Sequence, residues 1–167
     1  MAAGTDSSVN RAEHIAVLRA ASNALAAGDR LLLAQWRDDD WDKLLDCTSP
    51  RHFRASEVVI RRDAQERVLL FVLAGSLEVG VTQVDGVTIS PLAHITTGSV
   101  VGEQSFFDGQ PRSANVWGVT DGELLQLQFE DFVRFSDKEP ALARDLLFAL
   151  ARVLSSRLRN TTFRVRR

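Results

Sequence analysis

The sequence predicts an α+β fold, in which N-terminal helices and a long C-terminal helix flank an antiparallel β-barrel or jelly roll. Three observations lead to this expectation. Apolar residues recur every three or four positions before about Asp46, and again after Pro140, as one face of a helix requires. Between Pro50 and Phe129 the period changes to two, in short runs rich in β-branched residues with turn signals between them. Closely spaced short strands of this kind are typical of a sandwich or barrel.

The N-terminal zone, from about Ser8 to Asp46, is expected to be helical. Its first helix should end near Gly28, a residue suited to a C-terminal cap. A second short helix is expected to carry Leu31–Leu33. The apolar face of the first helix is formed by residues spaced three and four apart, namely Ala12, Ile15, Leu18, Ala21 and Leu25.

Three consecutive acids, Asp38–Asp40, precede a short apolar-spaced run that begins at Trp41. We expect an aspartate to be the N-cap of a helix here, because its carboxylate can accept hydrogen bonds from backbone N–H groups that lack a partner. A metal site is the alternative. Neighbouring residues point in different directions on a helix, so the sequence favours capping and solvation.

The central zone contains the predicted strands. Residues 68–75 form an aliphatic run, and residues 77–82 then alternate apolar and polar side chains, as a half-buried strand does. The pair Asp85 and Gly86 is a strong signal for a tight hairpin, and Pro91 indicates an edge or a bend in the strand that follows. The last predicted strand contains Leu125, Leu127 and Phe129.

The C-terminal zone returns to the helical period. Residues 129–135 suggest a short amphipathic helix, and Pro140 suits the first turn of a long helix because its missing N–H needs no partner there. One face of the long helix is expected to dock on the barrel. The apolar surface of the helix that remains could pair with the same helix of a second copy in a homodimer. The stripe consists of Ala143, Leu147, Leu150, Leu154 and Leu158, broadened by Leu146 and Val153.

We expect a helical arm at residues 1–40, the barrel at 41–137, and a C-terminal helix with a basic tail at 138–167. The chain has 167 residues, of which 45% are hydrophobic and 25% charged, and this composition excludes a disordered or collagen-like chain. We find neither an apolar run long enough to span a membrane nor a secretory signal. Cys47 is the single cysteine, so no internal disulfide can form, and a cytoplasmic location is expected.

Charge is unevenly distributed along the chain. Residues 61–139 carry six basic and twelve acidic groups, whereas residues 140–167 carry seven basic groups and one acidic group. The acidic centre argues against nucleic acid binding by the main body. The basic end could contact nucleic acid, an acidic membrane surface or an acidic protein. We favour a solvated helix end whose cations complement the helix dipole.

The segment Gly98–Val116 carries the residues most suited to binding an anion. Gly102 allows the backbone to approach a bound group closely, and a helical turn that begins near Glu103 would present free N–H groups. Arg112 could make a bidentate contact to a phosphate, and Ser113 adds a hydroxyl. Glu103 could accept hydrogen bonds from sugar hydroxyls, so the whole set would suit a nucleotide.

This segment resembles the phosphate-binding cassette of the cyclic nucleotide-binding domain family, which includes the bacterial catabolite activator protein. The family pattern has Gly-Glu followed, several residues later, by Pro-Arg-x-Ala. It corresponds here to Gly102–Phe106 and Pro111–Asn115. The resemblance covers about Trp41–Arg159, and it implies an antiparallel barrel with a phosphate-binding cassette and a terminal helix that closes as a lid.

The resemblance implies that the regulatory ligand is a cyclic nucleotide. Arg112 would pair with the exocyclic oxygens of the cyclic phosphate. Backbone N–H groups near Gln104 and Ser105, and at Ser113, would share that anion. Family frequency alone favours cAMP over cGMP.

The resemblance also places the sugar and the base. Glu103 would accept the ribose 2′-OH, and Gly102 would permit the close approach. The base would lie towards the long terminal helix, where helix phase alone does not choose among the candidates. The candidate base contacts are Asn115, Ser155, Ser156, Arg157 and Asn160.

Several positions depart from the family pattern. Gln104 stands where the family usually has an aliphatic residue. Asn115 replaces a frequent Thr or Ser, so the family's rules for adenine against guanine do not transfer. Ser56 replaces the usual Gly before Glu57.

An enzyme is not expected. His14, His52 and His94 are scattered, and none has a carboxylate or a second histidine at metal-ligand spacing. Cys47 has no motif around it, and neither a Gly-x-Ser-x-Gly turn nor a P-loop occurs. The sequence therefore predicts no catalytic residue and no metal site.

The expected function is a non-catalytic cyclic nucleotide sensor, in which the terminal helix moves over the base and signals to an effector protein. Only eight residues, NTTFRVRR, follow Arg159, which is too short for a helix-turn-helix domain, so direct DNA binding by this chain is not expected. The chain could act alone or as the regulatory piece of a larger protein. The alternative is a degenerate form of the fold that serves as a protein-interaction or dimerisation module.

Overall fold

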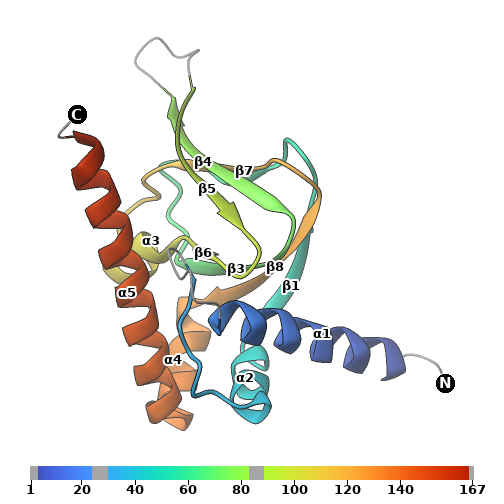
Figure 1. Ribbon diagram of the computed structural model, residues 1–167. Helices are drawn as coiled ribbons and strands as arrows, with labels where there is room; N and C mark the ends of the chain where they lie inside the picture. The colour runs from blue at the N-terminus through green and yellow to red at the C-terminus, as the bar shows by residue number, and fades with distance from the viewer. Residues whose placement is uncertain (1–3, 24–29, 83–88, 166–167) are drawn as a thin grey trace.

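The computed structural model describes residues 4–23, 30–82 and 89–165, in which two four-stranded antiparallel sheets face each other. Helices α1, α2 and α4 lie at one end of the sheets, and α5 runs along their side (Figure 1). The sheets have the strand orders β1-β8-β3-β6 and β2-β7-β4-β5. The strands are β1 (Ser49–Phe53), β2 (Val58–Ile60), β3 (Val68–Ala74), β4 (Ser76–Thr82), β5 (Ile89–Thr96), β6 (Val100–Val101), β7 (Asn115–Gly118) and β8 (Gly122–Gln128). The helices are α1 (Gly4–Ser22), α2 (Asp38–Leu45), α3 (Glu103–Asp108), α4 (Phe129–Lys138) and α5 (Pro140–Val165). The predicted α+β jelly roll between N-terminal helices and a long C-terminal helix is confirmed.

Strand β3 separates two hydrophobic cores. Its even-numbered residues, from Val68 to Val72, pack between the two sheets. Its odd-numbered residues, from Leu69 to Leu73, pack on the opposite side, in the core that the sheet shares with the helices. A strand that is buried on both faces needs apolar side chains at every position, and this explains the continuous aliphatic run in the sequence.

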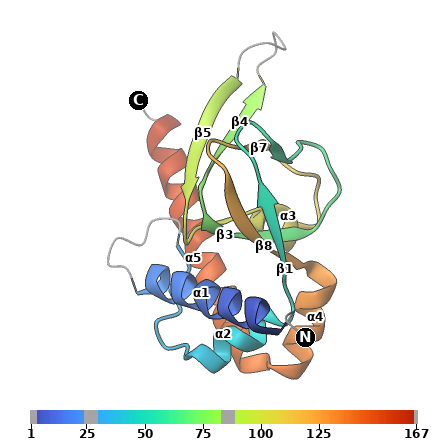
Figure 2. The same cartoon turned by 90° about the vertical axis from the view of Figure 1, so that its right-hand side faces the viewer.

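Helices α2, α4 and α5 build the second core below the barrel (Figure 2). Trp41 of α2, Phe135 of α4 and Leu146 of α5 are each at most 2% exposed. Burying an apolar side chain of this size contributes about 1.5–3 kcal/mol. These contacts anchor α5 along its N-terminal half. Helix α4 and the start of α5 at Pro140 agree with the predicted elements.

The buried face of α5 differs from the predicted stripe. The residues that dock on the core are Ala143, Leu146, Ala149, Leu150 and Val153. Leu147 and Leu158, which belong to the same predicted stripe, are 36% and 69% exposed. The helix carries apolar residues over more than one face, so its hydrophobic pattern alone did not identify the face that packs.

The predicted helix at Leu31–Leu33 is wrong. The segment is irregular, and Arg30 pairs with Ser99 in an isolated β-bridge. The N–H of Leu33 donates to the hydroxyl of Ser22 at 2.5 Å, and Leu31 and Leu33 are buried. Three adjacent leucines define no period, so their burial did not require a helix. The predicted cap at Gly28, the predicted hairpin at Asp85 and Gly86, and Leu25 lie outside the described residues.

Ion pairs join α1 to the acidic helix α2. Arg11 contacts the carboxylates of Asp42 and Asp46, and Arg19 contacts Asp38 at 2.7 Å. Arg37, not an aspartate, is the N-cap of α2, so the predicted aspartate N-cap is wrong. The acidic run supplies partners for arginines and forms the first turn of the helix.

Helix α1 also packs against the barrel. His14 lies 3.0 Å from the Glu123 carboxylate of β8, and its side chain is 10% exposed. At the turn between β5 and β6, Gly98 has φ +85°, and a Cβ added there would lie 2.2 Å from the Cβ of Ala21. The end of α1 therefore rests directly on backbone that leads into β6. Among the described residues, no helix is long and apolar enough to cross a membrane.

We predict that Gly98→Ala destabilises the protein more than Gly109→Ala. Both glycines have positive φ, which costs a residue with a side chain about 1–2 kcal/mol. Only Gly98→Ala also forces α1 away, which adds about 1–3 kcal/mol, whereas the nearest atom to a Cβ at Gly109 is 3.7 Å distant. Urea denaturation of the two variants measures the difference. Equal losses would show that α1 is not docked as described.

Candidate functional site

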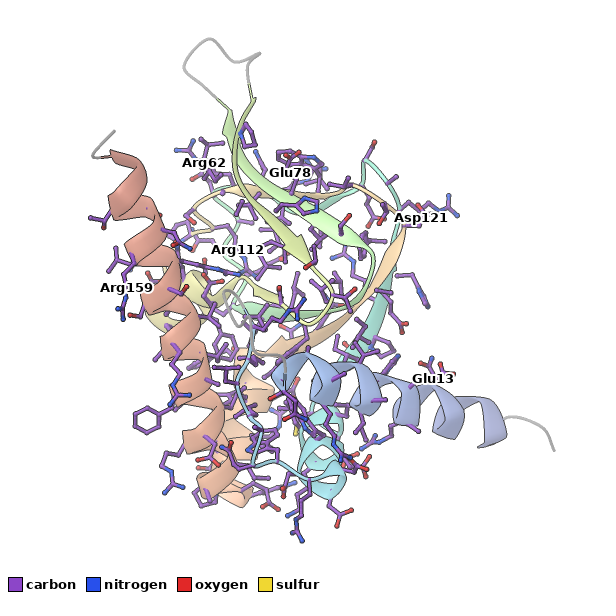
Figure 3. The ribbon with its side chains drawn as sticks, viewed as in Figure 1. Glu13, Arg62, Glu78, Arg112, Asp121 and Arg159 are labelled. Carbon is purple, nitrogen blue, oxygen red and sulfur yellow. The ribbon has the colours of Figure 1, made fainter. Side chains whose placement is uncertain are left out.

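A cavity of about 320 Å³ opens between strand β5, the turn that precedes α3, and the C-terminal half of α5. Its size falls at the lower end of the range of about 300–1,000 Å³ usual for small-molecule sites. Its walls include apolar residues of the β2-β7-β4-β5 sheet, such as Ile60, Val79 and Val116, and Val101 of β6 from the other sheet. Arg112 lies between the barrel and α5 in Figure 3, whereas Arg159 of α5 points away from the barrel.

At Gly102 the backbone of the turn before α3 packs closely against the side chain of Arg112. Gly102 is the N-cap of α3 and has φ +90°, in the left-handed region that favours glycine. A Cβ at this position would lie 2.5 Å from Nη1 of Arg112 and 2.7 Å from the carbonyl oxygen of Val68. Only glycine therefore lets the turn lie against the arginine.

Arg112 is a buried cation held by backbone carbonyl groups. Its side chain donates from Nη1 to the carbonyl of Gly102 at 3.0 Å, and from Nη2 to the carbonyl of Val68 at 2.7 Å. The residue is 3% exposed, and among the described residues Nε has no hydrogen-bond partner. Burial lowers the pKa of the Arg112 guanidinium, while Glu66 and Glu103 act in the opposite direction. An arginine keeps its proton despite such a shift, so the site holds a positive charge that is not fully paired.

Glu103 connects the cassette to the terminal helix. Its Oε2 lies 2.7 Å from Nη1 of Arg157, and the two side chains are 5% and 19% exposed. Arg157 also donates from Nη2 to the carbonyl of Val100 in β6 at 2.6 Å. The C-terminal half of α5 is thus tied to both sides of the turn at Gly102.

The cavity brings together most of the candidate residues. Ser105 is 3% exposed, whereas Gln104 and Ser113 are exposed. From α5, Arg157 and Asn160 also line the cavity. The candidates that line it are Gly102, Glu103, Gln104, Ser105, Arg112, Ser113, Arg157 and Asn160.

Three candidates lie elsewhere. Asn115 is half-buried, and its side-chain oxygen accepts the backbone N–H of Arg62 at 2.9 Å. Ser155 and Ser156 face a separate shallow groove beside Arg152, formed by α5 alone. None of the three lines the cavity.

The sequence reasoning missed some residues that do line the cavity. Leu92 and His94 reach it from β5, and Thr161 reaches it from α5. Thr161 lies four residues after Arg157, on the same helix face, so helix phase would have identified it once Arg157 was placed. His94 carried no such signal, because its place depends on the pairing of β5 with β4.

Two observations in the described part of the chain concern metal binding and thiol chemistry. No group of three or more His, Cys, Asp or Glu residues there could hold a metal ion. Burial raises the pKa of the Cys47 thiol, which disfavours the nucleophilic thiolate. The site offers a buried cation with an unpartnered N–H, a carboxylate and apolar walls. Such a set can hold an anion that also carries hydroxyl groups and an apolar surface.

Comparisons with known proteins point to one family. A family model described as "Cyclic nucleotide-binding domain" matches residues 50–139. A curated relative, glutaminase 2 of Bradyrhizobium diazoefficiens, is 28% identical over 131 residues. The match covers 78% of this chain but only 20% of that protein, so the chain spans about a fifth of the length of this relative.

Solved structures show the same fold. A cyclic nucleotide-binding domain from Methylobacillus flagellatus has a TM-score of 0.78 and 18% identity, with 94% of this chain and 83% of that chain covered. The catabolite activator protein of Thermus thermophilus has a TM-score of 0.66 and 27% identity, with 76% and 57% covered. The regulatory domain of Toxoplasma gondii PKA, crystallised with cAMP, has a TM-score of 0.61 and 20% identity, with 76% and 44% covered.

We predict that Glu103 and Arg157 are energetically coupled. Arg157→Gln leaves a buried carboxylate without its cation, which should lower the free energy of unfolding by about 1–3 kcal/mol. Adding Glu103→Gln should recover part of that loss. Denaturation of the two single variants and the double variant measures the coupling, with Arg144→Gln as control, since Arg144 makes an exposed pair with Asp145. Strictly additive losses would contradict the pairing.

Proposed function

The chain belongs to the cyclic nucleotide-binding domain family, and we propose that it is a non-catalytic sensor that binds one cyclic nucleotide, cAMP in preference to cGMP. The observation that carries the proposal is the buried guanidinium of Arg112, whose Nε–H lacks a partner among the described residues and which lines the cavity. A buried charge of this kind is stabilised by an anion. The cyclic phosphate supplies one negative charge of suitable size.

The phosphate would bind between Arg112 and the first turn of α3. The N–H groups of Gln104 and Ser105 lie in that turn, where no earlier helical carbonyl is available to them. Ser113 also lines the cavity, and its hydroxyl and N–H would add to the phosphate contacts. The anion would replace the missing partner of Arg112 without disturbing its bonds to the carbonyls of Gly102 and Val68.

The ribose would bind at Glu103, next to the open backbone of Gly102. The Glu103 carboxylate has a second oxygen besides the one that contacts Arg157, so it can accept the 2′-OH while the ion pair persists. The base would then lie between β5 and α5, near Leu92, Arg157 and Asn160. The positions of Asn115, Ser155 and Ser156 do not support a direct base contact in this arrangement.

Signalling would use the C-terminal half of α5. Ligand contacts at Glu103, Arg157 and Asn160 would favour one position of this half over another, and only such a difference in affinity can shift a conformational equilibrium. The neighbour crystallised with cAMP supports a cyclic nucleotide as the ligand and favours the adenine base. We infer a cytoplasmic sensor with residues 41–137 as its ligand-binding part, acting alone or as the regulatory part of a larger protein on an effector protein.

We also infer that two chains associate through a strip of α5 that consists of the exposed residues Leu147, Ala151 and Leu158 and the half-buried Leu154. These residues are spaced four, three and four apart, the repeat of a two-helix seam. Leu158 is 69% exposed, which is unusual for a leucine near the middle of a helix face. The strip is also the feature that favours the alternative function, a dimerisation module without sensing.

Calorimetric titration tests the sensor. We expect cAMP to bind once per chain, more tightly than cGMP. Arg112→Ala should weaken binding by about 100-fold or more, because losing the charged partner of a buried ion costs about 2–5 kcal/mol. Arg62→Ala is the matched control, since Arg62 is a half-exposed arginine that pairs with Asp63 outside the cavity. A folded protein that binds neither nucleotide at millimolar concentration would support the degenerate module instead.

Solution mass tests the association. We expect a dimer that Leu158→Glu converts to monomer, because a carboxylate would be placed within an apolar seam. Val133→Glu adds the same charge at an apolar residue of α4 that is 41% exposed, and it should leave the mass unchanged. A wild-type monomer at all concentrations would contradict the role of the strip.

A further inference from the structure

Arg67 occupies the residue immediately before β3, and its side chain caps the C-terminal end of α3. Its Nη2 donates to the carbonyl of Phe106 at 2.8 Å and to that of Phe107 at 3.3 Å. The last carbonyl groups of a helix have no partner within the helix, so each needs a donor from outside. Helix α3 has only six residues, and a charged donor at its end fixes where the helix lies.

The same guanidinium packs on the first residue of α4. The Cζ atom of Arg67 lies 3.4 Å from the centre of the Phe129 ring, within the distance for a cation–π interaction. The carbonyl of Arg67 also accepts the N–H of Phe129 at 3.0 Å. Phe106 of α3 meets the rings of Phe129 and Phe132 edge-on, with both centroid distances 5.5 Å. Arg67 therefore lies where the end of α3 meets the start of α4.

The backbone next to Arg67 holds the other end of the cassette. The carbonyl of Val68 accepts the hydrogen bond from Nη2 of Arg112. Two consecutive residues therefore hold the two parts of the site. The carbonyl of Val68 fixes Arg112, and the side chain of Arg67 fixes α3. The phosphate contacts proposed above come from these same two places, so their relative position depends on residues 67 and 68.

We propose that Arg67 is a positioning residue for the anion site, and that it couples α3 to α4 and α5. This inference rests on the proposed function for its effect on affinity. Without the Arg67 side chain, the end of α3 loses its donor and its link to Phe129. The helix is then less ordered before ligand arrives, and its ordering opposes binding. Movement of α3 is also passed on less completely to α4.

Two substitutions at residue 67 and one control test the proposal. Arg67→Lys keeps the charge but loses the planar fork that reaches two carbonyls and stacks on a ring. Arg67→Gln removes the charge as well. Arg62→Gln is the control, because Arg62 lies in the same connection between β2 and β3 and forms its ion pair with Asp63. Melting temperature verifies that each variant is folded.

Hydrogen exchange and calorimetry give the readouts. In the free protein, we expect the amides of α3 to exchange about tenfold faster in both variants at residue 67, with no change in the control. We expect cAMP to bind roughly 5- to 30-fold more weakly, and to alter exchange in α4 and α5 less than it does in the wild type. Weaker binding combined with unchanged exchange in α3 would overturn the proposal.

The exchange measurement without ligand separates this inference from the proposed function. If the wild-type protein binds no cyclic nucleotide, the sensor fails, but α3 in the free Arg67→Lys variant still tests the positioning role. Unchanged exchange there overturns the inference on its own. If Arg67→Gln does not fold, Arg67→Lys provides the same comparison with the charge retained.

Discussion

The buried guanidinium of Arg112 is the interaction on which the site depends. At 3% exposure it has lost most of its water, and it recovers two hydrogen bonds from the carbonyls of Val68 and Gly102. Those two bonds require the end of the β2–β3 connection and the turn before α3 to meet at the arginine. The turn can come that close only because residue 102 has no side chain. Arg112 also lines a cavity, and its buried Nε–H has no hydrogen-bond partner among the described residues.

The two cores on either side of β3 connect this site to the helices. One core holds the sheets together, and the other holds α2, α4 and the N-terminal half of α5 against them. In the proposed signalling, the C-terminal half of α5 would change position about this anchor while the barrel keeps its shape. Arg157 joins that half to Glu103 and to the carbonyl of Val100, which lie on either side of the turn at Gly102. In the proposed site, a ligand at Glu103 would therefore act directly on the helix.

The strands and the cassette could be predicted from the sequence, because both depend on local patterns. Alternation marked the half-buried strands, and the spacing of Gly102, Glu103 and Arg112 indicated the site. The helix predicted at Leu31–Leu33 failed because a run of identical apolar residues defines no period. The sequence did not identify which part of the apolar stripe of α5 docks, because the helix is apolar on more than one side and only the shape of the core selects among them.

Contacts between distant segments could not be predicted. The local sequence carries no signal for the ion pair of Glu103 with Arg157 or for the hydrogen bonds of Arg67 to the end of α3. Each of these contacts joins residues dozens of positions apart. An arginine in a loop is ordinarily a surface charge. Burial and partner geometry distinguish Arg67, Arg112 and Arg157 from the exposed arginines of the chain.

Nitrogen-15 NMR of the arginine side chains tests the central claim most directly. The Nε–H signal of Arg112, assigned by its loss in Arg112→Lys, should shift downfield and exchange more slowly as cAMP is added. The change should saturate at one ligand per chain, because the phosphate supplies the partner that this group lacks. Saturable binding of cAMP that leaves the Arg112 signal unmoved would contradict the account.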